Sequence, residues 1–260
     1  MINSFLTTFG LAAFSVFLFM TLGFIISVLR KRNDIADTLW GLGFILVAAI
    51  SLIHTGLFSL IQLLVTTLVT IWGLRLALHI YLRNRKKKED HRYEEMHRQW
   101  KGNFYLNSYL RVFLAHGLLL LLISIPVIFI NASSVASFNW IVILGLLIWL
   151  KGFFFESVGD YQLSQFLMDA KNHGHVMQSG LWKFTRHPNY YGEVMQWWGI
   201  FVIALSIPGS WFTVIGPALI TFLIIKVSGV PLLEKKYAGR PEWEDYKKRT
   251  NMFIPWFPKK

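Results

Sequence analysis

Long apolar runs separated by short polar stretches fill the chain up to about residue 229. A transmembrane helix needs about 20 predominantly apolar residues, and these runs approach or exceed that length. We predict seven spans, at 4–29, 38–54, 60–82, 108–130, 139–166, 191–207 and 210–229. The pattern therefore predicts an all-α integral membrane protein, a seven-transmembrane-helix bundle with a short amphipathic C-terminal segment from Glu234 to Pro258.

The loops between these runs alternate in charge. Basic loops lie at 30–32, 83–107, 167–190 and after 230, whereas the turns at 55–59, 131–138 and 206–210 contain no Lys or Arg. Because positive residues favour the cytoplasmic side of a membrane, we expect the N-terminus outside and the basic loops and the C-terminus in the cytoplasm. We expect the membrane to be a bacterial inner membrane.

Composition supports a membrane protein and excludes several kinds of site. Of the 260 residues, 54% are hydrophobic and 15% are charged, against about 25% charged in soluble proteins. The net charge of +12 lies in the loops, where anionic lipid headgroups account for it better than nucleic acid does. The absence of cysteine excludes disulfides, thiolate catalysis and cysteine-ligated metals, and the histidines show no metal-ligand spacing, so we expect no metal.

The densest polar run is Ser179–Glu193, which contains Arg186, Asn189 and Tyr190. One interpretation is an interfacial belt of basic and aromatic anchors. The other is a ligand site, since Arg forks onto phosphate, Asn can bond a ring amide, and Tyr can stack. The buried acid expected at Glu193 favours a site for an anionic, ring-bearing ligand.

Three further acids are candidates for chemistry. Glu156 and Asp160 are four residues apart, so they share one helix face. Acids at membrane depth are functional candidates, but these two could instead end their helix at the interface and pair with Lys151 or Arg186. Asp37 opens the second span, as a helix cap or as a proton donor to a substrate.

The motif Arg186-His187-Pro188-Asn189-Tyr190-Tyr191-Gly192-Glu193, within Trp182–Gly199, resembles the C-terminal domain of the steroid 5-alpha-reductase family. The match is closest to the bacterial, DUF1295-type branch of that family. Other matching pieces make the resemblance cover most of the chain: Asp37–Gly41, Trp72–Leu76, Glu89–Tyr93, Glu156–Gln162 and Glu234–Tyr246. The Arg-His-Pro-Asn-Tyr piece is shared with sterol reductases and, with Ser for Asn, with isoprenylcysteine carboxyl methyltransferases.

The resemblance implies an oxidoreductase that uses NADPH to reduce the 4,5 double bond of 3-oxo-4-ene steroids or similar enone lipids. It implies one membrane domain over 1–260, with substrate-side helices in 1–130 and a cofactor-binding region in 139–260. It implies that Asp37 is the acid that holds the substrate ketone, and that Trp72 stands at the position of the family's tyrosine. The implied cofactor-binding residues are Glu156, Asp160, Arg186, His187, Asn189, Tyr190, Glu193 and Tyr246.

Two other functions stay open at this point. One is an S-adenosylmethionine-dependent membrane methyltransferase of the isoprenylcysteine carboxyl methyltransferase type, and the other is a lipid or sterol binder without catalysis. The acid pair Glu156 and Asp160, followed by Tyr161-Gln162, favours the reductase. The expected partners are an apolar steroid-like substrate and membrane lipids.

Overall fold

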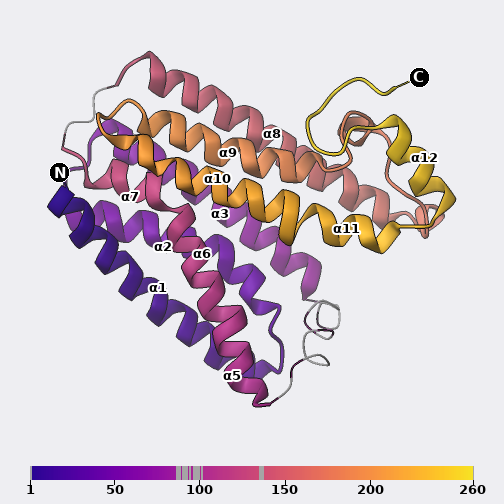
Figure 1. The fold of residues 1–260 in the computed structure, drawn as a ribbon, viewed down its shortest axis with the longest axis horizontal. Coiled ribbons are helices and arrows are strands. Elements are labelled where there is room, and N and C mark those ends of the chain that lie inside the picture. The colour runs from indigo at the N-terminus through magenta and orange to yellow at the C-terminus, as the bar shows by residue number, and fades with distance from the viewer. Residues whose placement is uncertain are drawn as a thin grey trace. The chain divides into compact units, whose positions relative to one another are not determined.

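The computed structural model describes residues 2–85, 89, 93, 95, 100, 102–134 and 138–259, and these residues form helices and no strands. About half of the predicted basic loop 83–107 lies outside them. The chain divides into two compact units, Met1–Phe138 with Ala204–Ile215 (unit 1) and Asn139–Ile203 with Gly216–Lys260 (unit 2). Figure 1 shows the helices of both units along the chain.

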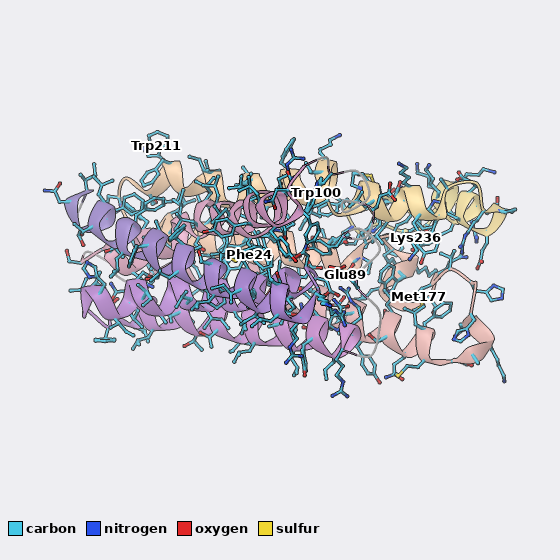
Figure 2. All side chains as sticks on the ribbon, turned by 90° about the horizontal axis from the view of Figure 1, so that it is seen from below. Phe24, Glu89, Trp100, Met177, Trp211 and Lys236 are labelled. Atoms are coloured by element: carbon cyan, nitrogen blue, oxygen red, sulfur yellow. The ribbon has the colours of Figure 1, made fainter. Side chains whose placement is uncertain are left out.

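Unit 1 contains the helices of the N-terminal half. They are α1 (Ile2–Arg30), α2 (Ile35–Thr55), α3 (Leu60–Asn84), α5 (Phe104–Ser108), the π-helical η1 (Tyr109–Leu114), α6 (Ala115–Ile123), α7 (Ile125–Ala132) and the 3-10 turn η4 (Ser210–Val214). In unit 1, α2 packs against both α1 and α3. Gly41 and Gly73 permit the second contact, because a Cβ at either would lie within 2.6 Å of the other's carbonyl oxygen. Trp211 of η4 points outward (Figure 2).

Unit 2 carries the C-terminal helices. They are α8 (Trp140–Met168), the 3-10 turns η2 (Ala170–Asn172) and η3 (Gly180–Lys183), α9 (Pro188–Ala204), α10 (Ile215–Phe222), the π-helical η5 (Leu223–Val227), α11 (Val230–Tyr237) and α12 (Pro241–Arg249), with Ala204 and Ile215 themselves counted in unit 1. The amphipathic segment predicted after Glu234 is helical as far as Arg249 and extended beyond it.

Among the described residues, six helical stretches are long and apolar enough to cross a membrane. They are Ile2–Arg30, Ile35–Thr55, Leu60–Asn84, Phe104–Ile123, Trp140–Met168 and Ser210–Tyr237. The predicted span 191–207 corresponds to α9, which has 17 residues. The predicted span 108–130 is not one helix: it breaks at Ser124, and Pro126 lies in the first turn of α7, where its missing N–H costs nothing. The six stretches indicate an integral membrane protein.

A row of glycines brings α8 and α9 into backbone contact (Figure 1). A Cβ on Gly152 would lie 2.6 Å from the carbonyl oxygen of Gly192, and one on Gly145 would lie 2.7 Å from that of Gly199. The glycines recur every seven residues on both helices, which keeps them on one face. Small residues at such an interface let membrane helices approach closely, so the polar side chains between α8 and α9 are held on a rigid frame.

Candidate functional site

Two groups of polar side chains, one in each unit, contain the residues that the sequence singles out. Unit 2 holds Glu156 and Asp160 of α8 together with the polar residues at the beginning of α9. Unit 1 holds Asp37 of α2 and Trp72 of α3. Each group is connected by hydrogen bonds or ring contacts of its own.

In unit 2, Asp160 and Asn189 are paired across α8 and α9. The Asn189 Nδ2 group donates to Asp160 Oδ1 at 3.0 Å, and Asp160 is buried. Gly159 allows this approach, since a Cβ there would lie 3.2 Å from the backbone nitrogen of Asn189. Pro188 begins α9 and fixes the backbone just before Asn189. A neutral amide is thus one partner of the predicted intramembrane acid.

One turn earlier on α8, a second acid meets a second amide. Gln196 Nε2 donates to Glu156 Oε2 at 2.5 Å and to the Gly192 carbonyl at 3.3 Å. Both Glu156 and Gln196 are almost fully buried, with 2% and 1% of their surface exposed. Burial at this level disfavours an isolated charge, so Glu156 is held in place by a short bond to a neutral partner.

These two pairs leave amide oxygens available. Each amide turns its NH₂ group toward a carboxylate, which fixes its orientation. The Oδ1 atom of Asn189 and the Oε1 atom of Gln196 are then buried and have no hydrogen-bond partner among the described residues. A buried acceptor without a partner costs about 1–3 kcal/mol. Two such acceptors on one helix therefore mark a place where a ligand with N–H or O–H donors would be stabilised.

Glu193 and Tyr190 complete the polar beginning of α9. Glu193 follows Asn189 by four residues and is half-buried, so the two share a helix face. The ring of Tyr190 stacks on the ring of His187, with centroids 5.7 Å apart. His187 is itself buried, and burial lowers its pKa; the hydrogen bond from His187 to Glu234 and the Glu234 charge act in the opposite direction. His187 is therefore held as a neutral ring.

Arg186 is turned into the C-terminal part of unit 2. Its Nε and Nη2 atoms donate to Glu234 Oε1 at 2.9 and 2.7 Å, and its Nη1 atom donates to the carbonyls of Lys247 and Thr250 at 3.1 and 2.7 Å. All three guanidinium nitrogens are thus engaged inside the protein. Glu234 also lies 3.4 Å from His187 Nε2. A phosphate could bind Arg186 only in competition with these groups.

Tyr246 of α12 ties the same region to α8. Its hydroxyl donates to the Trp182 carbonyl, and the indole nitrogen of Trp182 donates to the Gly159 carbonyl at 3.1 Å. Tyr246 is buried, and burial raises its pKa. Gly180, with φ of +62°, turns the chain before Trp182, and the Leu181 N–H donates to Gln162 at 2.9 Å. Tyr246 and Gln162 thus position the loop that leads into α9.

In unit 1, Asp37 is bonded to a tyrosine from a distant segment. Tyr93 Oη donates to Asp37 Oδ1 at 2.7 Å, and His116 Nε2 of α6 lies 4.0 Å from the same oxygen. The other ring nitrogen of His116 is 2.7 Å from the Val112 carbonyl, so it carries the proton and Nε2 faces Asp37. Helix α2 begins at Ile35, before Asp37, and its cap position is Asp34. Asp37 is therefore not the cap residue of α2.

Trp72 lies in an aromatic row beside this acid. Its ring contacts Phe44 at 5.2 Å, Phe44 contacts Trp40 at 5.1 Å, and Trp40 contacts His116 at 5.6 Å. Trp72 is buried by these neighbours. Asp37, Trp40 and Phe44 share a face of α2, because they are spaced three and four residues apart. The hydroxyl group bonded to Asp37 comes from Tyr93, which the sequence did not single out as a site residue.

Four residues of these groups were missed at the sequence level: Tyr93, His116, Gln196 and Glu234. Gln196 has a signal, because Asn189, Glu193 and Gln196 form a polar stripe at helical spacing. The other three meet their partners across long stretches of chain, which no local pattern encodes. In the part of the chain that the structure describes, no group of three His, Asp or Glu side chains could hold a metal ion.

Comparison with known proteins gives one match. A family described as "Protein of unknown function (DUF1295)" matches residues 23–250. No curated protein and no solved structure matches the chain. The match includes α2, α3 and α8 to α12, and hence both polar groups. Since it spans most of the sequence, the chain belongs to the DUF1295 family.

Proposed function

We propose that this protein is a membrane-embedded oxidoreductase that uses NADPH to reduce the carbon–carbon double bond of an apolar enone, such as a 3-oxo-4-ene steroid. The observation that carries the proposal is the bond between Tyr93 and Asp37. Reduction of an enone requires a hydrogen-bond donor at the carbonyl oxygen, and a tyrosine hydroxyl held by a carboxyl group beside buried aromatic rings can supply one.

The residues of unit 2 fit a nicotinamide cofactor. The buried amide oxygen of Asn189, which has no partner in the described part of the chain, is suited to the NH₂ group of a carboxamide, and that of Gln196, about two turns further along α9, is suited to another donor. The acids Asp160 and Glu193 are suited to ribose hydroxyls, and Tyr190 offers a ring face. When bound, NADPH would supply the hydride. Arg186 and His187, predicted at the cofactor, would shape the loop before α9 from within, since their contacts are internal.

On the substrate side, the proposed donor works through two hydrogen bonds in series. If Asp37 carries a proton, it donates to Tyr93 Oη, which leaves the tyrosine proton for the substrate carbonyl. Carboxylic acids in apolar surroundings can stay protonated and donate in this way. His116, whose Nε2 atom faces Asp37, can exchange a proton with the acid after small adjustments. The aromatic row of Trp40, Phe44 and Trp72 would exclude water from this donor.

We further propose a seven-span topology in which α9 is the shortest span, with the N-terminus outside and the C-terminus in the cytoplasm of a bacterial cell. A length of 17 residues lies at the lower limit for crossing a bilayer. The alternation between basic loops and turns without Lys or Arg supports the orientation. Single cysteines at Ser134 and at Lys171 should be labelled from opposite sides of the membrane; labelling from one side would refute the topology.

A methyltransferase that uses S-adenosylmethionine remains the second candidate, because Glu156 and Asp160 would also suit a cationic ligand. Titration of the purified protein with NADPH, NADH and S-adenosylmethionine separates the two. We expect NADPH to bind most tightly, since its extra phosphate adds charge for the basic loops. Binding of S-adenosylmethionine alone would replace the reductase proposal, and equal affinity for NADPH and NADH would refute recognition of the extra phosphate.

A further inference from the structure

The last residues of unit 2 form a non-helical segment, Thr250–Lys259, which bends at 252–254 and which we call the C-terminal strap. It is held by hydrogen bonds to the loop before α9. The Arg186 N–H donates to the Asn251 carbonyl at 2.9 Å, the Thr185 hydroxyl donates to the Phe253 carbonyl at 2.8 Å, and the Trp256 N–H donates to the Phe184 carbonyl at 2.9 Å. The strap is therefore fixed along its length.

Exposure alternates along the first part of the strap. Asn251, Phe253 and Pro255 are half-buried, and the ring of Phe253 contacts that of Tyr191 at 5.9 Å. The alternate residues Met252, Ile254 and Trp256 are exposed. Water would favour polar residues on the exposed face of such a strap, but every residue in this outward row is apolar.

The exposed area at the end of the strap is large. Ile254 and Trp256 are each 67% exposed, and Phe257 is 74% exposed. Contiguous apolar groups on a surface mark a site of interaction. All of α8 and all of α11 belong to stretches long and apolar enough to cross a membrane, Trp140–Met168 and Ser210–Tyr237. A bilayer therefore lies against unit 2. Trp is also the residue most typical of the membrane–water interface.

Basic side chains surround the base of the strap. The Thr250 hydroxyl donates to the Lys183 carbonyl, and the Lys259 N–H donates to the Arg249 carbonyl at 2.8 Å. These bonds bring the exposed residues Lys183, Arg249 and Lys259 to the place where the strap begins and ends. An apolar row flanked by lysines matches the headgroup region of an anionic bilayer, where the apolar groups enter and the cations stay with phosphate.

We propose that the C-terminal strap docks on the anionic headgroup layer of the membrane through Ile254, Trp256 and Phe257, with Lys183 and Lys259 at lipid phosphates. The partner is a lipid surface. Because the strap is bonded to Phe184, Thr185 and Arg186, docking would fix the loop that leads into α9. This inference does not depend on the reaction proposed above.

Because the chain has no cysteine, a single introduced cysteine can be labelled at one chosen position. Ile254→Cys, Trp256→Cys and the control Asp245→Cys would each carry one polarity-sensitive fluorophore in nanodiscs of phosphatidylcholine with or without phosphatidylglycerol. All three positions are exposed, so the substitutions should preserve the fold. Spin labels attached to the lipids would quench a fluorophore that lies in the bilayer, and iodide in the buffer would quench one that lies in water. We expect lipid quenching at 254 and 256, and iodide quenching at 245.

Docking on anionic lipid predicts stronger lipid quenching with phosphatidylglycerol than without it. Each lysine near an anionic surface raises the affinity for that surface roughly fivefold. The double variant Lys183→Glu, Lys259→Glu should therefore lower the lipid quenching by about fivefold or more. Equal quenching in both lipids would refute the role of phosphate charge. Iodide quenching at 254 equal to that at 245 would overturn the docking, and protection from both quenchers would indicate a protein partner instead.

Discussion

Tyr93 donates a hydrogen bond to Asp37 at 2.7 Å. A second contact joins the residues that lie four positions earlier in each segment: Glu89 accepts from the Asn33 backbone N–H at 2.5 Å. Both contacts join residues that are 56 positions apart in the sequence. Together they hold Glu89 and Tyr93 against the beginning of α2. Asn33 is held in turn by the Ser108 hydroxyl, which donates to its side-chain oxygen at 2.8 Å. The segment that carries the hydroxyl needed by the reductase proposal is thus bonded to unit 1 at two residues, Glu89 and Tyr93.

The glycine contacts between α8 and α9 should be sensitive to a single methyl group. Gly192→Ala places a Cβ 2.5 Å from the Gly152 carbonyl oxygen, so the helices must separate, at about 1–3 kcal/mol as for other overpacked sites. Gly10→Ala on α1 is the matched control, because no atom lies within 4 Å of its Cβ. Thermal unfolding in detergent would measure both variants. Equal midpoints for the two would mean that α8 and α9 are not packed through their glycines.

Arg186 should matter for stability more than an exposed cation does. Arg186→Ala leaves Glu234 and two carbonyls without their donor in a mostly buried place, and loss of one partner of such a pair costs about 3–5 kcal/mol. The control is Lys248→Ala, which breaks the exposed pair with Asp245 and should cost less than about 1 kcal/mol. Comparable losses of unfolding free energy in the two variants would rule out an anchoring role for Arg186.

His187 should make stability depend on pH. Burial lowers its pKa from the ordinary 6.5, so the unfolded chain takes up the proton first as the pH falls. The free energy of unfolding should therefore be highest above that value and decrease as the pH falls below it. His187→Gln should lose part of this decrease between about pH 7.5 and 5.5, whereas His173→Gln in the exposed loop should keep it. An unchanged pH profile in His187→Gln would show that the ring does not titrate in this way.

Asn189 should contribute to nucleotide binding. Asn189→Ala removes the buried acceptor and leaves Asp160 without this donor, which should weaken NADPH binding by about 1–3 kcal/mol. Asn172→Ala removes a side-chain amide that donates to the Phe166 carbonyl at 3.0 Å in the loop between α8 and α9, and should leave the affinity unchanged. Isothermal titration calorimetry with NADPH would measure the affinity of both variants. If Asn172→Ala weakened NADPH binding as much as Asn189→Ala did, Asn189 would have no specific role in binding.

The sequence predicts the membrane-crossing pattern and the local pairs well. The apolar runs give the positions of the long helices, and the spacing of four between Glu156 and Asp160 gives their common face. The break at Ser124 was missed because the run 108–130 is apolar on both sides of it. The internal contact of Arg186 could not be predicted, because its partner Glu234 is 48 residues away; its role at the cofactor stays a prediction. Tyr93 was missed for the same reason, since its bond to Asp37 spans 56 residues.

The central claim is that Asp37 and Tyr93 together polarise the carbonyl of an enone that is reduced with NADPH. The most direct measurement is the turnover of progesterone or testosterone with NADPH by the parent protein, Tyr93→Phe and Asp37→Ala. Tyr93→Phe keeps the buried ring and removes only the hydroxyl. The account predicts turnover by the parent, a loss of roughly 10²-fold or more in each variant, the scale for one oxyanion donor, and unchanged NADPH affinity. Parent-like turnover in Tyr93→Phe, or no turnover of an enone by a parent protein that binds NADPH, would contradict it.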